Sequence, residues 1–295
     1  MRMELERFLH YIEVEKNYSP NTIKGYQDNI EMFLDFLEQK KCSSFRRVDD
    51  RLVRAYLVEL YHHQYAKKTV ARHISSLRSL FKFLLQEGII EENPMELISN
   101  PKLDKKLPTV LNYEEMEELL ESPDLSTPLG VRDACMWEVL YSTGIRVSEL
   151  VSLKLQDINY SLKQIKVLGK GSKERYVLFG SICERRLKEY LKVRENLNVH
   201  HSEYLFLNAQ GEKLTTHGVR FIMKKYVRMG DFKGNVTPHM IRHTFATDML
   251  NEGADLKSVQ ELLGHENLST TQIYTHVTNE RLRKVYLDSH PRARK

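Results

Sequence analysis

The stretch NPKLDKKLP, residues 100–108, divides this chain more sharply than any other part of its sequence. It holds two prolines and four charges and offers little to bury, a composition typical of a linker. At 295 residues the chain is long enough for a domain with its own core on either side. We therefore predict two domains, residues 1–99 and residues 109–295, joined by this linker.

The first hundred residues have the apolar spacing of helices. Ser19 suits the N-cap and Pro20 the first position of a helix that continues to about residue 37. Two further helices are expected near 49–62 and 67–86, and a short one near 91–98. Within 67–86 the apolar spacing predicts one buried stripe that leaves three polar side chains off it: Arg72, Ser76 and Ser79.

The second part begins with helical patterns and then changes its period. Asn112 can cap an amphipathic helix, and residues 129–141 form a further helix that ends before Ser142. Residues 164–180 alternate with a period of two on either side of GKGSK, which predicts a β-hairpin. Its second arm alternates through Arg175, Val177 and Phe179. The remainder is mostly helical, so the expected fold class is mainly α in two domains, the second being α+β with a small β-sheet.

The composition is that of a globular protein without a membrane segment. Hydrophobic residues make up 41% and charged residues 29%, and no apolar run approaches the ~18 residues of a membrane span. The start, MRMELERFLH, lacks the apolar region of a signal peptide. We expect a cytoplasmic protein that has no membrane partner. Cys42, Cys135 and Cys183 are widely spaced and expected to be reduced.

The net charge of +5 is mild, but its distribution is uneven. Residues 60–86 contain no acid and carry five cations: Lys67, Lys68, Arg72, Arg78 and Lys82. An acid-free cationic stretch suggests a surface that faces a polyanion. The alternative is an ordinary solvated helix face.

The stretch TPHMIRHTFA places two imidazoles and a guanidinium on one helix. His239, Arg242 and His243 stand at i, i+3 and i+4 and therefore project from one face. Two histidines at this spacing can hold a metal, but there is no glutamate between them and Arg242 opposes a divalent cation. An anion fits better, because the guanidinium matches two phosphate oxygens. His243 could instead be satisfied within a core.

Three other stretches carry weaker signals. In STGIRVSEL, Arg146 opens a short helix, and Glu149 one turn later can orient its guanidinium, although an ordinary surface salt bridge would look the same. GKGSK fails the P-loop pattern, so Lys170 is a hairpin lysine able to reach into a groove, and Lys173 is a solvated one. In LLGHENLSTTQIYTHV, Gly264 ends a helix directly before His265.

Taken in order, TGIRVSEL, GKGSKER, HMIRHTFAT and LLGHENLSTTQIYTH closely resemble the tyrosine recombinase (phage integrase-like) family of DNA strand-exchange enzymes. The resemblance extends to the N-terminal part, which is similar to that family's helical, SAM-like core-binding domain. QIYTHV and the ending SHPRARK look like the Xer chromosome-resolving recombinases, with a lean toward the XerC rather than the XerD group.

The resemblance implies a set of catalytic residues, and each position holds the expected type: Arg146, Lys170, His239, Arg242, His265 and Tyr274. The two arginines would neutralise the phosphate and Tyr274 would attack it, forming a 3′-phosphotyrosyl link. His239 would be the base, His265 would donate to the phosphate, and Lys170 would protonate the departing 5′ oxygen. Glu149 and His243 would support them, and neither a metal nor another cofactor is implied.

The resemblance also implies partners. Double-stranded DNA carrying a recombination site would be clamped by both domains, with Lys68, Arg72 and Arg78 as N-terminal contacts. The segment after Tyr274 would dock into a neighbouring subunit of a homotetramer, or of a heterotetramer with a second, XerD-like Xer recombinase. A DNA translocase such as FtsK could gate the reaction, and the expected role is the resolution of chromosome or plasmid dimers at cell division.

Four alternatives remain open at this stage. An integrase of a phage or mobile element would share the chemistry. A type IB topoisomerase would share the phosphotyrosine step but relax DNA without exchanging partners. A DNA-binding protein without catalysis would not need Tyr274. A zinc hydrolase would use His239, His243 and His265.

Overall fold

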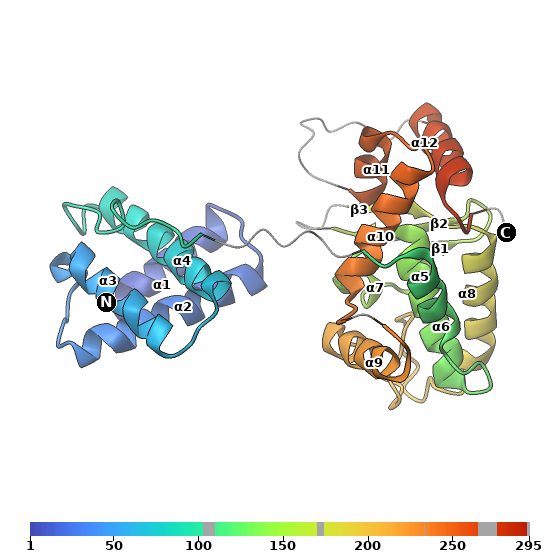
Figure 1. Cartoon of the computed structure of the whole chain (residues 1–295), viewed down its shortest axis with the longest axis horizontal. Coiled ribbons are helices and arrows are strands. Elements are labelled where there is room, and N and C mark those ends of the chain that lie inside the picture. The colour runs from blue at the N-terminus through green and yellow to red at the C-terminus, as the bar shows by residue number, and fades with distance from the viewer. Residues whose placement is uncertain (103–109, 170–173, 233, 265–275, 294–295) are drawn as a thin grey trace. The chain divides into compact units, whose positions relative to one another are not determined.

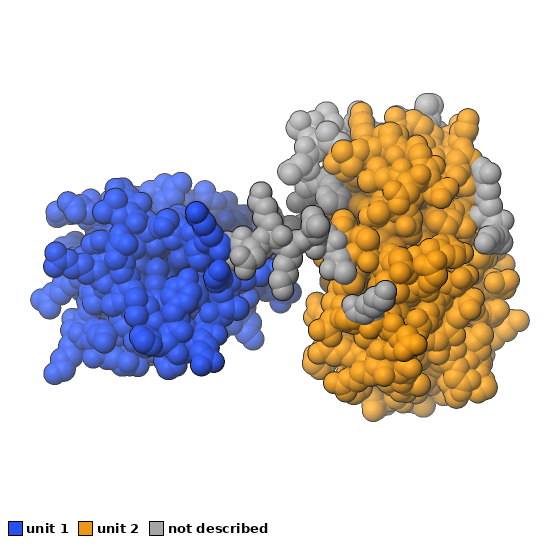
Figure 2. Space-filling view, viewed as in Figure 1, with its two compact units in different colours: residues 1–106 blue, residues 107–295 orange. Residues whose placement is uncertain are grey.

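The computed structural model of the chain describes residues 1–102, 110–169, 174–232, 234–264 and 276–293, with the side chains of 276–279 left out. Two compact units account for the chain, residues 1–106 and 107–295 (Figure 2). The predicted linker, residues 100–108, lies largely outside the described residues. The fold class is confirmed: the chain is mainly helical, and a small sheet occurs in the second unit.

In its described residues, the first unit contains the helices α1 (Arg2–Val14), α2 (Pro20–Gln39), α3 (Asp50–His62) and α4 (Lys67–Gln86), and a 3-10 turn, η1 (Phe45–Arg47). Ser19 caps α2 through a hydrogen bond from the Thr22 N–H, and Pro20 is its first residue, as predicted. Helix α4 packs against α1, α2 and α3. Phe33 lies at the centre of the core, with its ring edge-on to those of Tyr56 and Phe81.

Two expectations for the first unit are wrong. Residues 91–98 form turns rather than a helix, because the Asn93 side chain accepts the Met95 N–H and no α-helical ladder begins. Ser76 is buried rather than exposed off the apolar stripe of α4. A hydrogen bond of 2.9 Å from the Asn29 side-chain amide satisfies its hydroxyl, which makes its burial tolerable.

The second unit is built around α6 (Pro128–Thr143), which contacts α5 (Tyr113–Glu121), α8 (Ser181–Arg194) and α10 (Pro238–Asn251) (Figure 1). Nearly every residue of α6 from Gly130 to Thr143 is buried, since partners surround it. Asn112 caps α5 in a capping box, as predicted.

Helix α6 is longer than predicted at its C-terminal end. The Ser142 and Thr143 hydroxyls donate back within the helix, to the Glu138 carboxylate at 2.8 Å and the Val139 carbonyl at 2.6 Å. These bonds satisfy two polar side chains that would otherwise mark a loop. Gly144 then ends the helix in the left-handed conformation, with φ of 62°.

The sheet is antiparallel, in the order β1 (Ile158–Asn159), β2 (Gln164–Leu168), β3 (Glu174–Leu178), and follows the turn η2 (Leu155–Asp157). The predicted hairpin forms from β2 and β3, with Ile165 opposite Val177 and Val167 opposite Arg175. Strand β1 was not predicted. Apolar side chains on the inner face join the core of the second unit.

The remaining elements of this unit are α7 (Val147–Leu150), α9 (Thr216–Met229), α11 (Leu256–Leu263) and α12 (His276–Ser289). Helix α12 packs against α10 and α11 of its own unit, and Tyr286 is fully buried there. Among the described helices, none is long and apolar enough to cross a membrane. All three cysteines are unpaired and buried.

Candidate active site

Helix α10 carries the His–Arg cluster. The Thr237 hydroxyl accepts the Met240 N–H and Pro238 is the first helical residue, so the helix begins just before His239. His239 is exposed, His243 is half-buried, and Arg242 is only 6% exposed. One turn of helix thus directs a guanidinium inward and leaves an imidazole at the surface.

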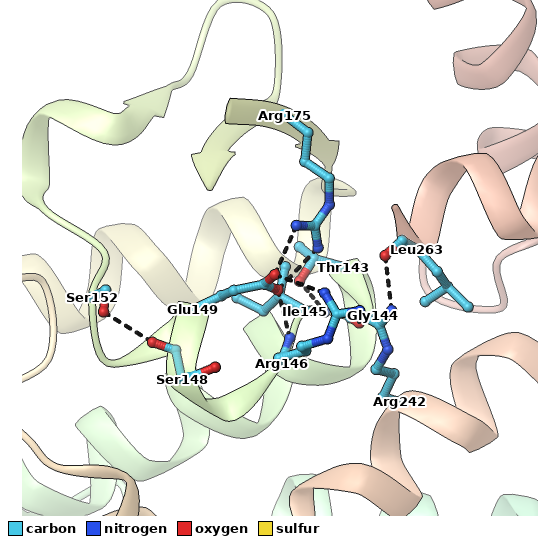
Figure 3. Close-up of polar contacts among 10 residues, drawn as sticks. All are labelled: Thr143, Gly144, Ile145, Arg146, Ser148, Glu149, Ser152, Arg175, Arg242 and Leu263. Atoms are coloured by element: carbon cyan, nitrogen blue, oxygen red, sulfur yellow. Dashed lines mark hydrogen bonds and ion pairs between the residues drawn. The ribbon is translucent and has the colours of Figure 1, made fainter. Parts of the chain in front are cut away.

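Arg242 is held by main-chain carbonyl groups from two distant segments. Its Nη1 donates to the Gly144 carbonyl at 2.6 Å and its Nη2 to the Leu263 carbonyl at 2.8 Å (Figure 3). Burial first, and the neighbouring Arg146 second, lower the pKa of Arg242 to about 10. The side chain therefore stays charged at neutral pH, and a bound anion would relieve the cost of that charge.

Arg146 lies at the entrance to α7 and remains 46% exposed at its side chain. Its main-chain N–H donates to Glu149 Oε2 at 2.8 Å, and its Nη1 donates to Oε1 at 3.1 Å. The predicted contact between Arg146 and Glu149 is thus present, and it turns the guanidinium toward Arg242 (Figure 3).

Arg175 on β3 was not singled out from the sequence, yet it belongs to the same cluster. Its Nη1 and Nη2 donate to the two oxygens of Glu149 at 2.7 and 2.9 Å (Figure 3). Burial raises the pKa of Glu149, but the hydrogen bonds and charges of Arg175 and Arg146 outweigh it and lower the pKa overall. The sequence pattern could have predicted its burial, because Arg175 alternates with Val177 and so shares the core-facing side of a strand.

Arg146 and Arg175 both bind the Glu149 carboxylate, and Arg242 lies close enough for the charges of all three to act on it, so the cluster carries an excess of two positive charges. Such a cluster is suited to a dianionic or anionic oxygen group, above all a phosphodiester passing through a more charged transition state. Glu149 is fully engaged and has no capacity left to act as a base.

Close backbone approach at Gly144 makes this geometry possible. A Cβ at this position would lie 2.7 Å from the Phe245 ring and 2.8 Å from the Leu263 side chain. Glycine thus allows the end of α6 to approach α10 and the last residue of α11, and its carbonyl meets Arg242 of α10.

The other predicted catalytic residues, Lys170, His265 and Tyr274, lie outside the described residues. For two of them a flanking element is described: β2 ends before the segment with Lys170 and β3 begins after it, and Gly264 ends α11 directly before His265. In the described ranges no three His, Cys, Asp or Glu side chains gather as a metal site would require.

The predicted DNA contacts on α4 differ in their surroundings. Lys68 and Arg72 are exposed. Arg78 is half-buried, and its guanidinium donates to the Ile98 carbonyl at 2.8 Å and to Asn100 at 3.5 Å. Arg78 therefore holds residues 98–100 against α4. Lys68 and Arg72 present their charges to solvent.

Family models match both units. The model described as "Phage integrase family" matches residues 109–281, and "Phage integrase, N-terminal SAM-like domain" matches residues 5–88. The predicted SAM-like first domain and recombinase-type second domain are thereby confirmed.

Curated relatives resemble almost the whole chain. "Tyrosine recombinase XerC" of Oceanobacillus iheyensis is 48% identical over 99% of this chain and 97% of its own length. The protein of the same name in Bacillus subtilis (strain 168) is 46% identical, over 97% and 95%.

Among solved structures, the XerH site-specific recombinase bound to palindromic difH substrate, a post-cleavage complex, is 28% identical with a TM-score of 0.71. The match covers 96% of this chain and 83% of that one. A lambda integrase dimer bound to a COC′ core site, 19% identical with a TM-score of 0.69 over 96% and 77% of the two chains, shares the fold.

Proposed function

The chain belongs to the phage integrase family and is a tyrosine recombinase, a DNA-binding enzyme that cleaves and rejoins DNA, and from this we propose how its residues perform that reaction and what it serves. The observation that carries the proposal is the convergence of Arg146 and Arg242 beside Glu149 (Figure 3). Together they form a preorganised receptor for one phosphodiester.

The two arginines bind the non-bridging oxygens of the scissile phosphate. Because both guanidiniums are already oriented by hydrogen bonds, little reorganisation is needed when charge develops in the pentacovalent transition state. The bound phosphate stabilises the charge of Arg242 most, because this guanidinium is buried among other cations and has carbonyl groups rather than a carboxylate as its partners.

Tyr274 supplies the nucleophile. Its hydroxyl oxygen attacks phosphorus, the bond from phosphorus to the 5′ oxygen breaks, and a 3′-phosphotyrosyl link forms. His239 takes the tyrosine proton, and Lys170 gives a proton to the departing 5′ oxygen. His265 donates to a phosphate oxygen, and His243 supports α10. The link conserves the phosphodiester bond energy, so a 5′ hydroxyl of a second duplex can reverse the step and exchange strands.

We assign the chain a role in resolving chromosome or plasmid dimers at cell division, within the cytoplasm. Support comes from full-length relatives named XerC at 46–48% identity and from a structural relative that acts on a difH site. The active assembly is a tetramer on two DNA sites, either of this chain alone or with a XerD-like partner. A DNA translocase such as FtsK gates it. The alternative role is that of a phage or mobile-element integrase.

The test uses a nicked suicide duplex carrying a Xer-type site, incubated with the protein in EDTA. We expect an SDS-resistant protein–DNA adduct from the wild type and none from Tyr274→Phe, because only the hydroxyl can form the covalent link. An adduct that persists in Tyr274→Phe would contradict the assignment of the nucleophile.

A plasmid assay then separates the two biological roles. A plasmid dimer that carries two directly repeated sites should be resolved to monomers. If this chain alone forms the adduct but gives no monomers, addition of a XerD-like partner should produce them. Exchange confined to two unlike sites, one from an element and one from a chromosome, would favour the integrase.

A further inference from the structure

Arg175 occupies a position that strand geometry reserves for apolar side chains. It lies opposite Val167 and two residues before Val177, and all three are buried, Arg175 being 7% exposed. A guanidinium at such a place costs free energy unless it is paired, and an apolar residue of similar size often serves stability as well or better. Stability alone is therefore a poor reason for an arginine here.

The pairing of Arg175 is directed at one carboxylate that also holds Arg146. Arg175 takes both oxygens of Glu149 with its two terminal nitrogens, at 2.7 and 2.9 Å. Arg146 takes the same two oxygens with its main-chain N–H and Nη1. Because Arg175 fixes the plane and position of the carboxylate, it also fixes where the half-exposed Arg146 guanidinium is held.

Arg175 also touches the end of α11. A Cβ on Gly264 would lie 2.7 Å from Arg175 Cδ and Nε and 3.2 Å from its Cζ, so the arginine stem passes directly over this glycine. Its Nε–H is buried and has no hydrogen-bond acceptor in the described part of the chain. Gly264 directly precedes His265 in the sequence.

We propose that Arg175 is a positioning residue for strand cleavage: it locks Glu149 so that Arg146 meets the phosphate. The proposal rests on the function assigned above. Arg175 acts through Glu149 and does not itself contact DNA. It therefore joins β3 to α7 through Glu149 (Figure 3), and it also packs against Gly264 at the end of α11.

The experiment measures single-turnover adduct formation on the nicked duplex at saturating protein, together with DNA affinity and thermal midpoint. For Arg175→Gln we expect unchanged affinity and a cleavage rate lower by about tenfold to hundredfold, because displacements of about 1 Å near reacting atoms have effects of that size. Arg175→Lys should also stay slow, since one ammonium cannot hold both carboxylate oxygens. Restoration of the wild-type rate by lysine would overturn the proposal.

A double-variant cycle distinguishes positioning from an independent effect. If Arg175 acts through Glu149, then Arg175→Gln combined with Glu149→Gln should cleave as slowly as Glu149→Gln alone. Multiplied losses would mean that the two residues act separately and would overturn the proposal.

The matched control is Arg132→Gln, which breaks another buried pair of the same unit. Arg132 and Asp133 are paired at 2.7 Å with side chains 5% and 7% exposed, at the far end of α6 from Gly144. Arg132→Gln should be less stable than the wild type yet cleave at the wild-type rate when folded. If its cleavage rate fell as much as that of Arg175→Gln, the role of Arg175 would be structural only. Failure of the wild type to form an adduct would instead reject the proposed function.

Discussion

The guanidinium of Arg242 donates a 2.6 Å hydrogen bond to the main-chain carbonyl of Gly144, 98 residues earlier in the chain. A second bond, to the Leu263 carbonyl, holds its other terminal nitrogen. Carbonyl oxygens fix the direction of the cation without neutralising it. The charge thus remains available to an incoming phosphate. A carboxylate partner would instead have competed with the phosphate for Arg242.

Arg242→Lys should therefore bind the recombination site but form the covalent adduct about 10²- to 10³-fold more slowly. A lysine ammonium cannot reach two carbonyl groups in fixed directions and still face a phosphate. Rates of adduct formation at saturating protein measure this. Arg132→Lys, a change at a buried arginine far along α6, is the control and should keep the wild-type rate.

Inorganic phosphate should stabilise the wild type by occupying this site. The pKa of Arg242 is about 10 in the folded chain, lower than its ordinary value, so its charged form carries a cost in the fold at every pH below about 10. At ten times its Kd, phosphate should add about 1.4 kcal/mol to the free energy of unfolding. Arg242→Lys should show only the smaller, general effect of the salt. Equal stabilisation of both proteins would argue against an anion site.

Glu149→Gln should destabilise the second unit by about 3 kcal/mol at pH 7, because two buried or half-buried arginines lose their common anion. The pKa of Glu149 is lowered in the fold. Its stabilising contribution is therefore present above the ordinary value of 4.5 and is lost as the pH falls through the lower folded value. Urea unfolding should show the gap between wild type and variant closing below pH 4.5.

His290 should make the attachment of the C-terminal segment acid-sensitive. It is buried against Tyr286, Tyr141 and Phe245, its Nε2 lies 3.2 Å from the Tyr141 carbonyl, and burial lowers its pKa to about 4. The unfolded chain binds a proton near pH 6.5 and the folded chain does not until about pH 4. The wild type should then lose about 2 kcal/mol between pH 7.5 and pH 5 from this group.

Urea unfolding of His290→Gln at both pH values isolates that contribution, since every other titrating group is shared with the wild type. The variant should start from lower stability at pH 7.5 because it loses the ring stacking on Tyr286. Its further decline toward pH 5 should be smaller than that of the wild type. Parallel declines would contradict the buried, neutral state of His290.

The exposed cations of α4 should differ from Arg78 in their effect on DNA binding. Lys68→Ala and Arg72→Ala should each reduce the slope of log Kobs against log[salt] by about 1, as expected for one lost phosphate contact. Arg78→Ala should instead lower the thermal midpoint, because the Ile98 carbonyl loses its 2.8 Å partner. If Arg78→Ala changed the salt-dependence slope as much as Lys68→Ala does, Arg78 would contact DNA and this distinction would be wrong.

Short-range patterns in the sequence predicted those parts of the fold that short-range chemistry controls. Ser19, Asn112 and Gly264 end or begin helices because a side-chain oxygen or a positive φ is needed at that one position. The contact between Arg146 and Glu149 was predictable for the same reason, since one turn of helix separates them. The same local logic failed at residues 91–98, where the turn formed by Asn93 competes with a helix.

By itself, then, the sequence determined the helices, the hairpin, the family and the residue types available for phosphate chemistry, because each depends on neighbours within a few positions or on motifs in a fixed order. Only the tertiary structure decided which partners those residues meet. Asn29 satisfies a buried Ser76, Gly144 offers its carbonyl to Arg242, and Arg175 reaches Glu149 from a strand 26 residues away. Such pairings arise when distant elements pack into one core, and no local pattern specifies them.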